Sequence, residues 1–597
     1  MSINCKAFLR GASALIGVSA SALMATPASA YDGGGAAYYA YDGGATFSPG
    51  ASDYGFTPLS GAGGGGASFD GVSQMDVRAL NGNSSYIPPD TMGAVGASQF
   101  FETTNGAYAI FDKATGARQS ILSMNAFWQA AGQAGGSNGD SRVLFDASSQ
   151  KWIVMAFAAT DANGNLPSLE IAVSNDSNAL DGFKSTTFTA FNPVGSAPIA
   201  DYPTLAIDSK AVYIGTNDFD LNAKQQFAGT TLTVINRRDL FGSSGPKVQT
   251  FTQFFAPCTT TACTDRGFAV QGVNQLGSDT GKVLATAATD YGQITYNVND
   301  PGTNHATETG AVTLDNTPYD SNFPARQPDL TTRGTTSARV VDTLDDRTSS
   351  AVWEQGGKIY STQTITPTGT DHTAVRWSIV DAKTQKVISE GYVGNNNDGF
   401  DYFQGSITVN KHGQVVIGYN RSGSNPLTGN ISVYANEYNP NRSGGLTLLK
   451  QVLMHVSPID DYHNGSTQFA PPVGRQRWGD YAQVTVDPNN PESFWVVGEY
   501  ALGYLPGATT SFSRWGTWIT DIKFGDGSDG GGDNGGDGGQ GGNSQGSNLS
   551  GGPNLPGAFA PAPLTAVPEP AAWGLMLMGF GLVGRTLRRR AGSAATA

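Results

Sequence analysis

The chain has 597 residues, a formal net charge of −14 and 79 glycines, and only 14% of its residues are charged. This balance argues against nucleic acid as a partner, because neutralising phosphates takes clustered Lys and Arg side chains. The abundance of Gly, Asn, Ser and Thr favours short strands joined by many turns rather than a helix bundle.

The N-terminal segment 1–30 has the three parts of a secretory signal peptide. A basic stretch with Lys6 and Arg10 comes before a short, weakly apolar run, and the small residues Ala28 and Ala30 follow it. Small residues in an A-x-A pattern are the usual cleavage site of signal peptidase. The segment therefore predicts export with signal peptidase as a partner. A buried N-terminal helix is the alternative.

The next segment, residues 31–74, is rich in Gly, Ala and Tyr. It lacks the apolar periodicity that packing against a core requires, so we expect it to be flexible. The folded body is then expected to cover residues 75–524.

A repeated pattern runs through this body. Each clear copy has an apolar strand, a turn at an Asp or Asn, and a second strand, which is typical of a β-hairpin. The turns of the four clearest copies fall at Asp146, Asp208, Asn410 and Asp487. With looser copies included, seven units begin near residues 93, 142, 202, 269, 338, 405 and 480, about 50 to 75 residues apart.

Four-stranded blades with generous loops fit this spacing. We therefore predict an all-β fold and a β-propeller of seven blades, with six or eight blades as alternatives. A pair of β-sandwiches is the other architecture that the pattern allows. The last strand, from Trp515 to Ile522, could pair with an N-terminal strand and close the ring.

Two segments near the ends of the body, residues 88–96 and 475–481, stand out as motif-like. They resemble the boundary segments of large secreted propeller-like proteins, and this resemblance implies no chemistry. An ion pair between the two segments would help to lock the first blade to the last, and a binding site at the propeller mouth is the alternative. The side chains expected to meet there are Asp90, Arg477, Asp480 and Tyr481.

Two cysteines of the body, Cys258 and Cys263, lie five positions apart. In an oxidising compartment they are expected to form a disulfide within one loop. A zinc site would need two further ligands, and no other Cys or His lies nearby in the sequence.

Clustered Asp and Asn side chains offer oxygen ligands in three loops. Calcium takes about six to eight oxygens, of which such a loop supplies about three or four. Turns stabilised by Asp and Asn without any metal are the alternative. No cofactor is required, and the weak calcium candidates are Asp218, Asp220, Asp398 and Asp401.

A hydrolase on the same fold is the main functional alternative. Glycosidase propellers use paired carboxylates near the axis, and sialidases add an arginine cluster for the substrate carboxylate. The chain has no G-x-S-x-G, H-E-x-x-H or P-loop motif, so catalytic residues cannot be named from the sequence. Residues that could supply parts of such a site are Arg142, Arg326, Glu354, Asp401, Arg477 and Glu499.

The C-terminal part begins with a Gly-, Asp- and Pro-rich stretch, residues 525–566, which we expect to be a flexible spacer. A four-residue motif, an apolar stretch of 14 residues over 571–584 and a basic flank follow it in that order. The stretch is short for a membrane helix, although snorkelling of Arg585 would extend it. The motif is Val567, Pro568, Glu569 and Pro570, and the basic flank is Arg585, Arg588, Arg589 and Arg590.

This tail, residues 567–590, resembles the PEP-CTERM sorting signal, which also carries the label ice-binding protein C-terminal domain. The resemblance implies a precursor held in the inner membrane by a hydrophobic helix, with residues 591–597 as a cytoplasmic tail. It further implies cleavage by an exosortase-type transpeptidase, after which the mature protein is at the cell surface or outside the cell. A permanent membrane anchor is the alternative.

Together these features predict an exported protein of the cell envelope or extracellular matrix. Its propeller is expected to bind an extracellular ligand such as polysaccharide, since aromatic rings can stack on sugars while Asn and Asp bond to hydroxyls. The alternative is a secreted glycoside hydrolase or sialidase-like enzyme.

Overall fold

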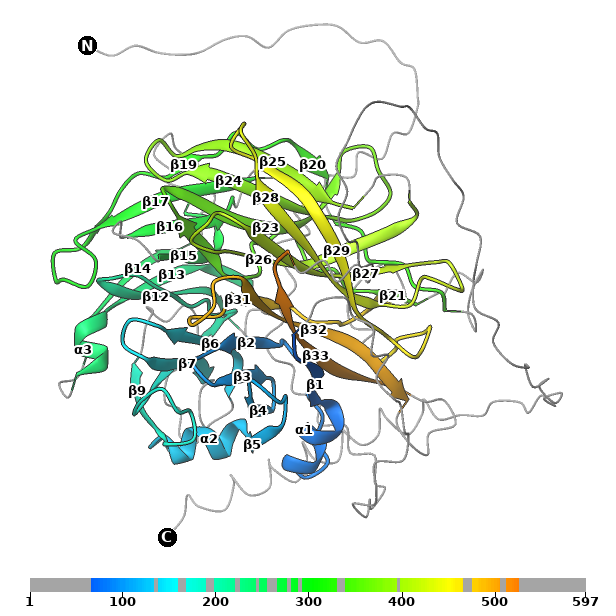
Figure 1. Ribbon diagram of the computed structural model, residues 1–597. Coiled ribbons are helices and arrows are strands. Elements are labelled where there is room, and N and C mark those ends of the chain that lie inside the picture. The colour runs from blue at the N-terminus through cyan, green and yellow to red at the C-terminus, as the bar shows by residue number, and fades with distance from the viewer. Residues whose placement is uncertain are drawn as a thin grey trace, which may run out of the picture. The chain divides into compact units, whose positions relative to one another are not determined.

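The strands of the protein surround a common centre in the computed structural model, and their colours run in sequence order around it (Figure 1). The chain divides into two units, Met1–Asp529 and Gly530–Ala597, and all described residues lie in the first. The structure describes residues 66–133, 138–158, 168–188, 198–220, 226–242, 246–254, 266–275, 281–287, 292–320, 322–329, 339–394, 398–464, 475–504 and 512–525.

The described strands form seven antiparallel meanders, numbered 1 to 7 here in chain order. Meander 1 contains β2 (Met92–Val95), β3 (Gln99–Thr104), β4 (Ala107–Asp112) and β5 (Arg118–Ser123), and meander 2 contains β6 (Asn138–Asp146), β7 (Lys151–Ala158), β8 (Ser168–Ser174) and β9 (Phe183–Phe188). Meander 3 contains β10 (Pro198–Asp201), β11 (Ala206–Ile207), β12 (Ala211–Asp220), β13 (Gln226–Asn236) and β14 (Val248–Phe254). Meander 4 contains β15 (Phe268–Gln275), β16 (Lys282–Thr286), β17 (Gln293–Asn299), β18 (Thr307–Glu308) and β19 (Val312–Thr313).

The remaining meanders complete the ring. Meander 5 contains β22 (Val352–Gln355), β23 (Lys358–Pro367), β24 (Ala374–Asp381) and β25 (Lys386–Val393), with β20 (Tyr319–Asp320) paired to β23. Meander 6 contains β26 (Phe400–Val409), β27 (Val415–Gly423), β28 (Ser432–Pro440) and β29 (Leu446–Val456), and meander 7 contains β31 (Gln483–Val486), β32 (Ser493–Tyr504), β33 (Ser513–Lys523) and β1 (Ser68–Ser73). The described elements also include three short helices, α1 (Gln74–Leu80), α2 (Met124–Ala130) and α3 (Arg237–Phe241). A separate parallel pair of strands is formed by β21 (Val340–Val341) and β30 (Arg475–Gln476).

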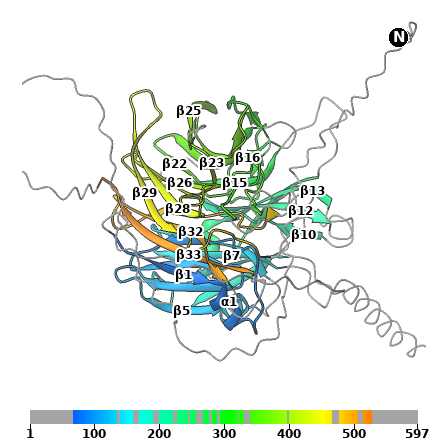
Figure 2. The same cartoon turned by 90° about the vertical axis from the view of Figure 1, so that its right-hand side faces the viewer.

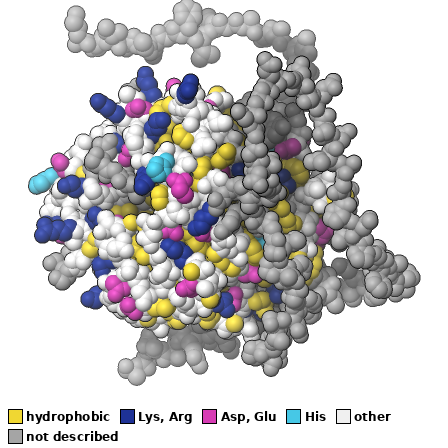
Figure 3. Space-filling view, viewed as in Figure 1, with side chains coloured by type: hydrophobic (Ala, Val, Ile, Leu, Met, Phe, Trp, Pro, Cys, Tyr) yellow, Lys and Arg dark blue, Asp and Glu magenta, His cyan; other side chains and the backbone are white. Residues whose placement is uncertain are grey.

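This arrangement confirms the predicted all-β propeller. Several connecting segments lie outside the described residues, and the number of blades stays a prediction. On the face shown in Figure 3, basic and acidic side chains are interspersed with polar and apolar ones.

Apolar side chains on facing sheets hold neighbouring meanders together. Ile153 of meander 2 belongs to the same buried cluster as Val212 of meander 3, and Val416 of meander 6 belongs to the same cluster as Val496 of meander 7. Each such buried side chain contributes about 1.5–3 kcal/mol by leaving water. The first strand of each meander lies innermost, since β2 contacts both β6 and β31, its counterparts on either side.

An N-terminal strand closes the ring, as the sequence predicted for the last strand of the body. β1 pairs with β33, with Ser68 opposite Thr520 and Phe69 opposite Ile519, and the two strands lie side by side in both views (Figures 1 and 2). The prediction that all of residues 31–74 are flexible is therefore wrong for residues 68–73. Val72 is fully buried, but one apolar pair gives no visible periodicity, and the partner strand lies about 450 residues away in the sequence.

Removing β1 is expected to destabilise the propeller. A chain that starts at residue 66 keeps β1, whereas one that starts at residue 74 loses it together with Ser73, which caps α1. Burial of Phe69 and Val72 alone contributes about 3 kcal/mol or more, so the shorter chain should unfold at lower temperature and lower urea concentration. Equal unfolding midpoints for the two chains would show that β1 does not close the ring.

The repeat unit placed near residue 338 is also wrong. Val340 and Val341 form β21, which pairs in parallel with β30, and the innermost strand of meander 5 begins at Val352. All ten residues from 341 to 350 are buried although none beyond β21 belongs to a strand. Val340 and Val341 do form a strand, but it pairs with β30 outside the meanders, which explains the error.

Candidate functional site

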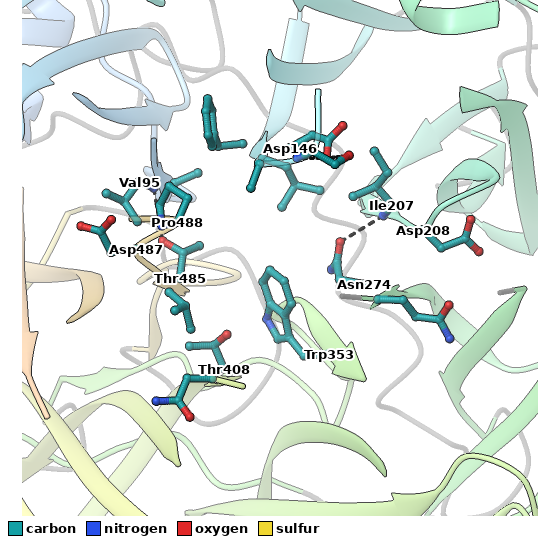
Figure 4. A pocket seen from close by; sticks show the side chains of 18 of the residues that line it. Val95, Asp146, Ile207, Asp208, Asn274, Trp353, Thr408, Thr485, Asp487 and Pro488 are labelled. Carbon is teal, nitrogen blue, oxygen red and sulfur yellow. Dashed lines mark hydrogen bonds between the residues drawn. The ribbon is translucent and has the colours of Figure 1, made fainter. Parts of the chain in front are cut away.

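Side chains from all seven meanders line one cavity of about 590 Å³. It lies where the innermost strands end and turn back, and Figure 4 shows its walls from close by. Cavities of this size are typical of small-molecule sites. The residues discussed below line it together with apolar side chains that include Ala94, Val95, Leu144, Phe145, Ile207, Val486, Pro488 and Pro491.

The repeated Asp and Asn turns of the sequence gather around this cavity. The side-chain oxygens of Asp146, Asp208, Asn410 and Asp487 each accept a hydrogen bond from the backbone N–H two residues further on, at 3.1, 2.7, 2.9 and 2.8 Å. This is the bond of an Asx turn, which lets the chain reverse direction tightly. The repeat is therefore structural, and it brings one turn of each of four meanders to the same opening.

The carboxylates of these turns already have strong partners. Asp146 forms an ion pair with Arg237, and Asp487 forms one with Lys113 at 3.0 Å. Asp208 accepts hydrogen bonds from the Tyr213 hydroxyl at 2.6 Å and from the Gly281 N–H at 2.9 Å. None of the three is thus poised as a free acid or base.

The pKa of Asp146 supports the same conclusion. Burial alone would raise the pKa of this carboxyl, but hydrogen bonds from Ser149 and Arg237 outweigh burial and hold the pKa below its usual value. Asp146 therefore stays ionised near neutral pH and keeps Arg237 neutralised.

One wall of the cavity differs from the rest, because the innermost strands of meanders 4 and 5 pair directly. β15 and β22 run parallel, with Asn274 opposite Trp353 and Gln275 opposite Glu354. Asn274 is fixed in place, since it accepts a hydrogen bond from the Ile207 N–H at 3.0 Å, drawn in Figure 4. The Trp353 indole extends from this wall into the middle of the cavity (Figure 4).

Three buried polar atoms of this wall have no hydrogen-bond partner among the described residues. They are the Nε1 atom of Trp353 and both side-chain amide atoms of Gln275, whose residue is only 8% exposed. A buried amide without a partner costs about 1–3 kcal/mol.

At the opposite end of the innermost strands, the predicted closure residues come together. The Asp480 N–H donates to Asp90 at 2.7 Å, and Arg477 donates to the Asp480 carboxylate at 2.6 Å. Asn105 donates to the second oxygen of Asp90 at 2.7 Å. The first of these bonds connects the segment before β2 with the segment before β31. It is a hydrogen bond, whereas the ion pair of Arg477 with Asp480 lies within one segment.

Further buried carboxyls surround this closure cluster. Burial and the nearby charges of Asp201 and Asp480 raise the pKa of Asp140 well above its usual value. Burial and the nearby charge of Asp480 raise the pKa of Asp201 to about 7. Burial and the charges of Asp90 and Asp480 raise the pKa of Glu499 well above its usual value.

The proposed parts of a hydrolase site are split among three places. Arg142, Arg477 and Glu499 lie in or beside the closure cluster, where they are buried. Arg326 forms an ion pair with Asp401 at 2.9 Å, and Glu354 accepts a hydrogen bond from the Gly357 N–H at 2.7 Å. Within the described ranges, no group of three or more His, Cys, Asp and Glu residues could hold a metal ion.

The calcium candidates have protein donors around them. Asp218 accepts bonds from Thr216 and Thr231, Asp398 from Tyr402 and Phe400, and Asp401 from Arg326 and Thr373. Calcium at these loops stays a prediction. The Asp220 side chain and both Cys258 and Cys263 lie outside the described residues, as do the signal-peptide and C-terminal residues named above.

Sequence reasoning missed Trp353 and Gln275 as site residues. It noted Glu354 at the end of a strand but had no means of seeing that this strand pairs in parallel with β15. The available signal was a Trp in a short strand that ends at a Gly-Gly turn.

Comparison with known proteins identifies one family model, the PEP-CTERM protein-sorting motif, at residues 566–590. No curated protein matches the chain. Similar solved structures include a thermostable family-43 glycoside hydrolase (11% identity, 63% of this chain and 96% of that chain covered, TM-score 0.31) and the Dos1 propeller (10%, 72% and 77%, 0.32). A third is a Trypanosoma rangeli sialidase in complex with the inhibitor DANA (10%, 64% and 55%, 0.31). At these values the similarity carries no argument about activity. Within the part that the structure describes, no helix has the length and apolar character needed to cross a membrane.

Proposed function

We propose that this chain, a secreted and exosortase-processed protein by its PEP-CTERM motif at residues 566–590, binds a neutral saccharide in the cavity at the centre of its propeller. The observation that carries the proposal is that Trp353 and Gln275, whose amide has no partner among the described residues, line one cavity. In this proposal the C-terminal segment holds the precursor in the inner membrane until processing, and the mature protein binds extracellular polysaccharide.

The chemistry of the walls supports a neutral ligand. Asp146 and Asp487 are neutralised by Arg237 and Lys113, so these charges are not available to bind an ion. The Trp353 face can stack on the apolar C–H face of a sugar ring. Sugar hydroxyls can at the same time supply the partners that Gln275 lacks, which relieves the desolvation cost of its amide.

The side chains that line the cavity fit saccharide binding better than saccharide hydrolysis. A glycosidase needs two carboxyl groups about 5–9 Å apart that face the scissile bond, one of them protonated. The carboxylates that line the cavity act instead as turn acceptors and ion-pair partners. The propeller is therefore proposed to recognise polysaccharide and not to cleave it.

Replacing Trp353 with alanine is expected to weaken saccharide binding by about 30-fold, because loss of a central aromatic contact is worth about 2 kcal/mol. The measurement is calorimetric titration of the purified chain with a panel of neutral oligosaccharides from starch, xylan, mannan and cellulose. Phe323→Ala removes another aromatic ring, one that is 45% exposed and does not line the cavity, and should leave binding unchanged. Failure of every panel member to bind the native chain would contradict the proposal.

Gln275→Leu separates binding from folding. The Gln275 amide has no partner among the described residues, so an apolar side chain of similar size should leave the unfolding temperature unchanged or raise it. Saccharide affinity should nevertheless fall about 10-fold, the equivalent of about 1.4 kcal/mol. A lower unfolding temperature with unchanged affinity would assign Gln275 a structural role instead.

A further inference from the structure

Buried side chains close the axis at the end opposite the cavity. At the closure end, Arg142 of meander 2 reaches across the axis and donates to the Ser349 carbonyl before meander 5 at 3.2 Å. It also donates to the Pro203 carbonyl of meander 3 at 2.8 Å. Its guanidinium lies 3.5 Å from the ring centre of Tyr481 in meander 7. One buried side chain thus connects four meanders around the centre.

A second layer of contacts seals the same end. The Tyr202 hydroxyl donates to the Ser349 carbonyl at 3.3 Å, and Gln271 of meander 4 donates to the Thr348 carbonyl at 2.8 Å. The guanidinium of Arg347 lies 4.3 Å from the Tyr202 ring centre and is held by Asp345 at 2.6 Å. The buried segment 341–350 therefore lies over the closure end of the innermost strands, and none of its residues is more than 8% exposed.

Residues of all seven meanders surround the cavity. Every one of the seven meanders contributes residues to its lining, from Ala94 in meander 1 to Pro491 in meander 7. A groove that accommodates a continuous polymer needs two opposite gaps in its walls, and a tunnel needs two ends. The hydrogen bonds of Arg142, Tyr202 and Gln271 close the far end of the axis, so among the described residues the turn side is the entrance to the cavity.

We infer that the cavity recognises the terminal residues of a neutral saccharide chain and excludes internal ones. The inference rests on the proposed function and adds the part of the polymer that is bound. Only a chain end can enter a blind cavity far enough to meet Trp353 and Gln275, which stand on the innermost strands β22 and β15. The rest of the chain then leaves through the same opening, past the turns at Asn410 and Asp487.

The test counts chain ends. Starch amylose, xylan and mannan are each presented intact and after limited acid hydrolysis, at equal mass, to the purified chain in calorimetric titrations. The inference predicts that the amount of protein bound per gram rises in proportion to the number of chain ends. An amount per gram that does not change with hydrolysis would overturn end recognition while leaving saccharide binding intact.

Two further comparisons separate this inference from the proposed function. Maltoheptaose and β-cyclodextrin share one linkage and one length, but the cyclic molecule has no end. If α-glucans bind, the linear molecule should bind and the cyclic one should not, and equal affinities would contradict end recognition. The Gln275→Leu variant should weaken the end-dependent binding about 10-fold. End-dependent binding that survives this change unaltered would place the site elsewhere, and no binding of any probe would contradict the proposed function itself.

Discussion

Replacing Arg142 with methionine is expected to lower the free energy of unfolding by about 3–5 kcal/mol. Methionine replaces the aliphatic part of the side chain but leaves the buried carbonyls of Pro203 and Ser349 without their donors. It also removes the stacking contact with Tyr481 and a positive charge close to Asp140. Urea unfolding of the two chains gives the difference directly.

Arg118→Met is the matched control for this change. Arg118 forms an ion pair with Asp76 at 2.9 Å, but its side chain is 39% exposed and the pair lies on the surface. Exposed pairs contribute about 0–1 kcal/mol, so this variant should unfold almost like the native chain. If Arg142→Met lowers the free energy of unfolding no more than Arg118→Met does, the contacts of Arg142 at the closure end do not stabilise the centre of the ring.

The protein is expected to be more stable near pH 5 than near pH 8. Buried carboxyls at the closure end, such as Asp140, Asp201 and Glu499, have folded-state pKa values above those of the unfolded chain. A group of this kind stabilises the fold fully below its unfolded pKa, and that stability is lost as pH rises through the folded pKa. The pKa of Asp201 rises from 3.8 to about 7, so its contribution to the free energy of unfolding falls by about 4 kcal/mol between pH about 4 and about 7.

Unfolding temperatures from pH 4.5 to 8.5 test this expectation. Asp201→Asn keeps the size of the side chain but cannot ionise, so the decline toward alkaline pH should become shallower. Asp381→Asn is the control, because Asp381 lies in an exposed turn where a hydrogen bond from Thr384 lowers its pKa. A native chain with equal or greater stability at pH 8 would contradict the assignment of protons to the buried cluster.

The fold was largely predictable because its repeat is local. An apolar strand, an Asx turn and a second strand lie within about 15 residues, so alternation and turn chemistry reveal each hairpin. The pairing of β33 with an N-terminal strand could be suggested but β1 could not be located, since only Phe69 and Val72 mark it. The strand at Val340 and Val341 was mistaken for part of a repeat because its pairing with β30, outside the meanders, leaves no distinct pattern in the sequence.

The two ends of the propeller axis were predictable to different degrees. Asp90 and Asp480 were expected to meet because both lie in motif-like segments at the limits of the body, and they do. The cavity at the other end depends on the parallel pairing of β15 with β22, which joins residues about 80 positions apart. Only this pairing brings Gln275 and Trp353 to the same wall, so no local pattern could identify them together.

The most direct test of saccharide binding at the axial cavity is the indole N–H resonance of Trp353. The chain has nine tryptophans, and a spectrum of the protein labelled with ¹⁵N-tryptophan, compared with that of Trp353→Phe, identifies this signal. Titration with an oligosaccharide from the panel that binds should move the Trp353 signal downfield as its N–H acquires an acceptor, with an affinity equal to the calorimetric one. Saccharide binding that leaves the Trp353 resonance in place would contradict the axial cavity as the binding site.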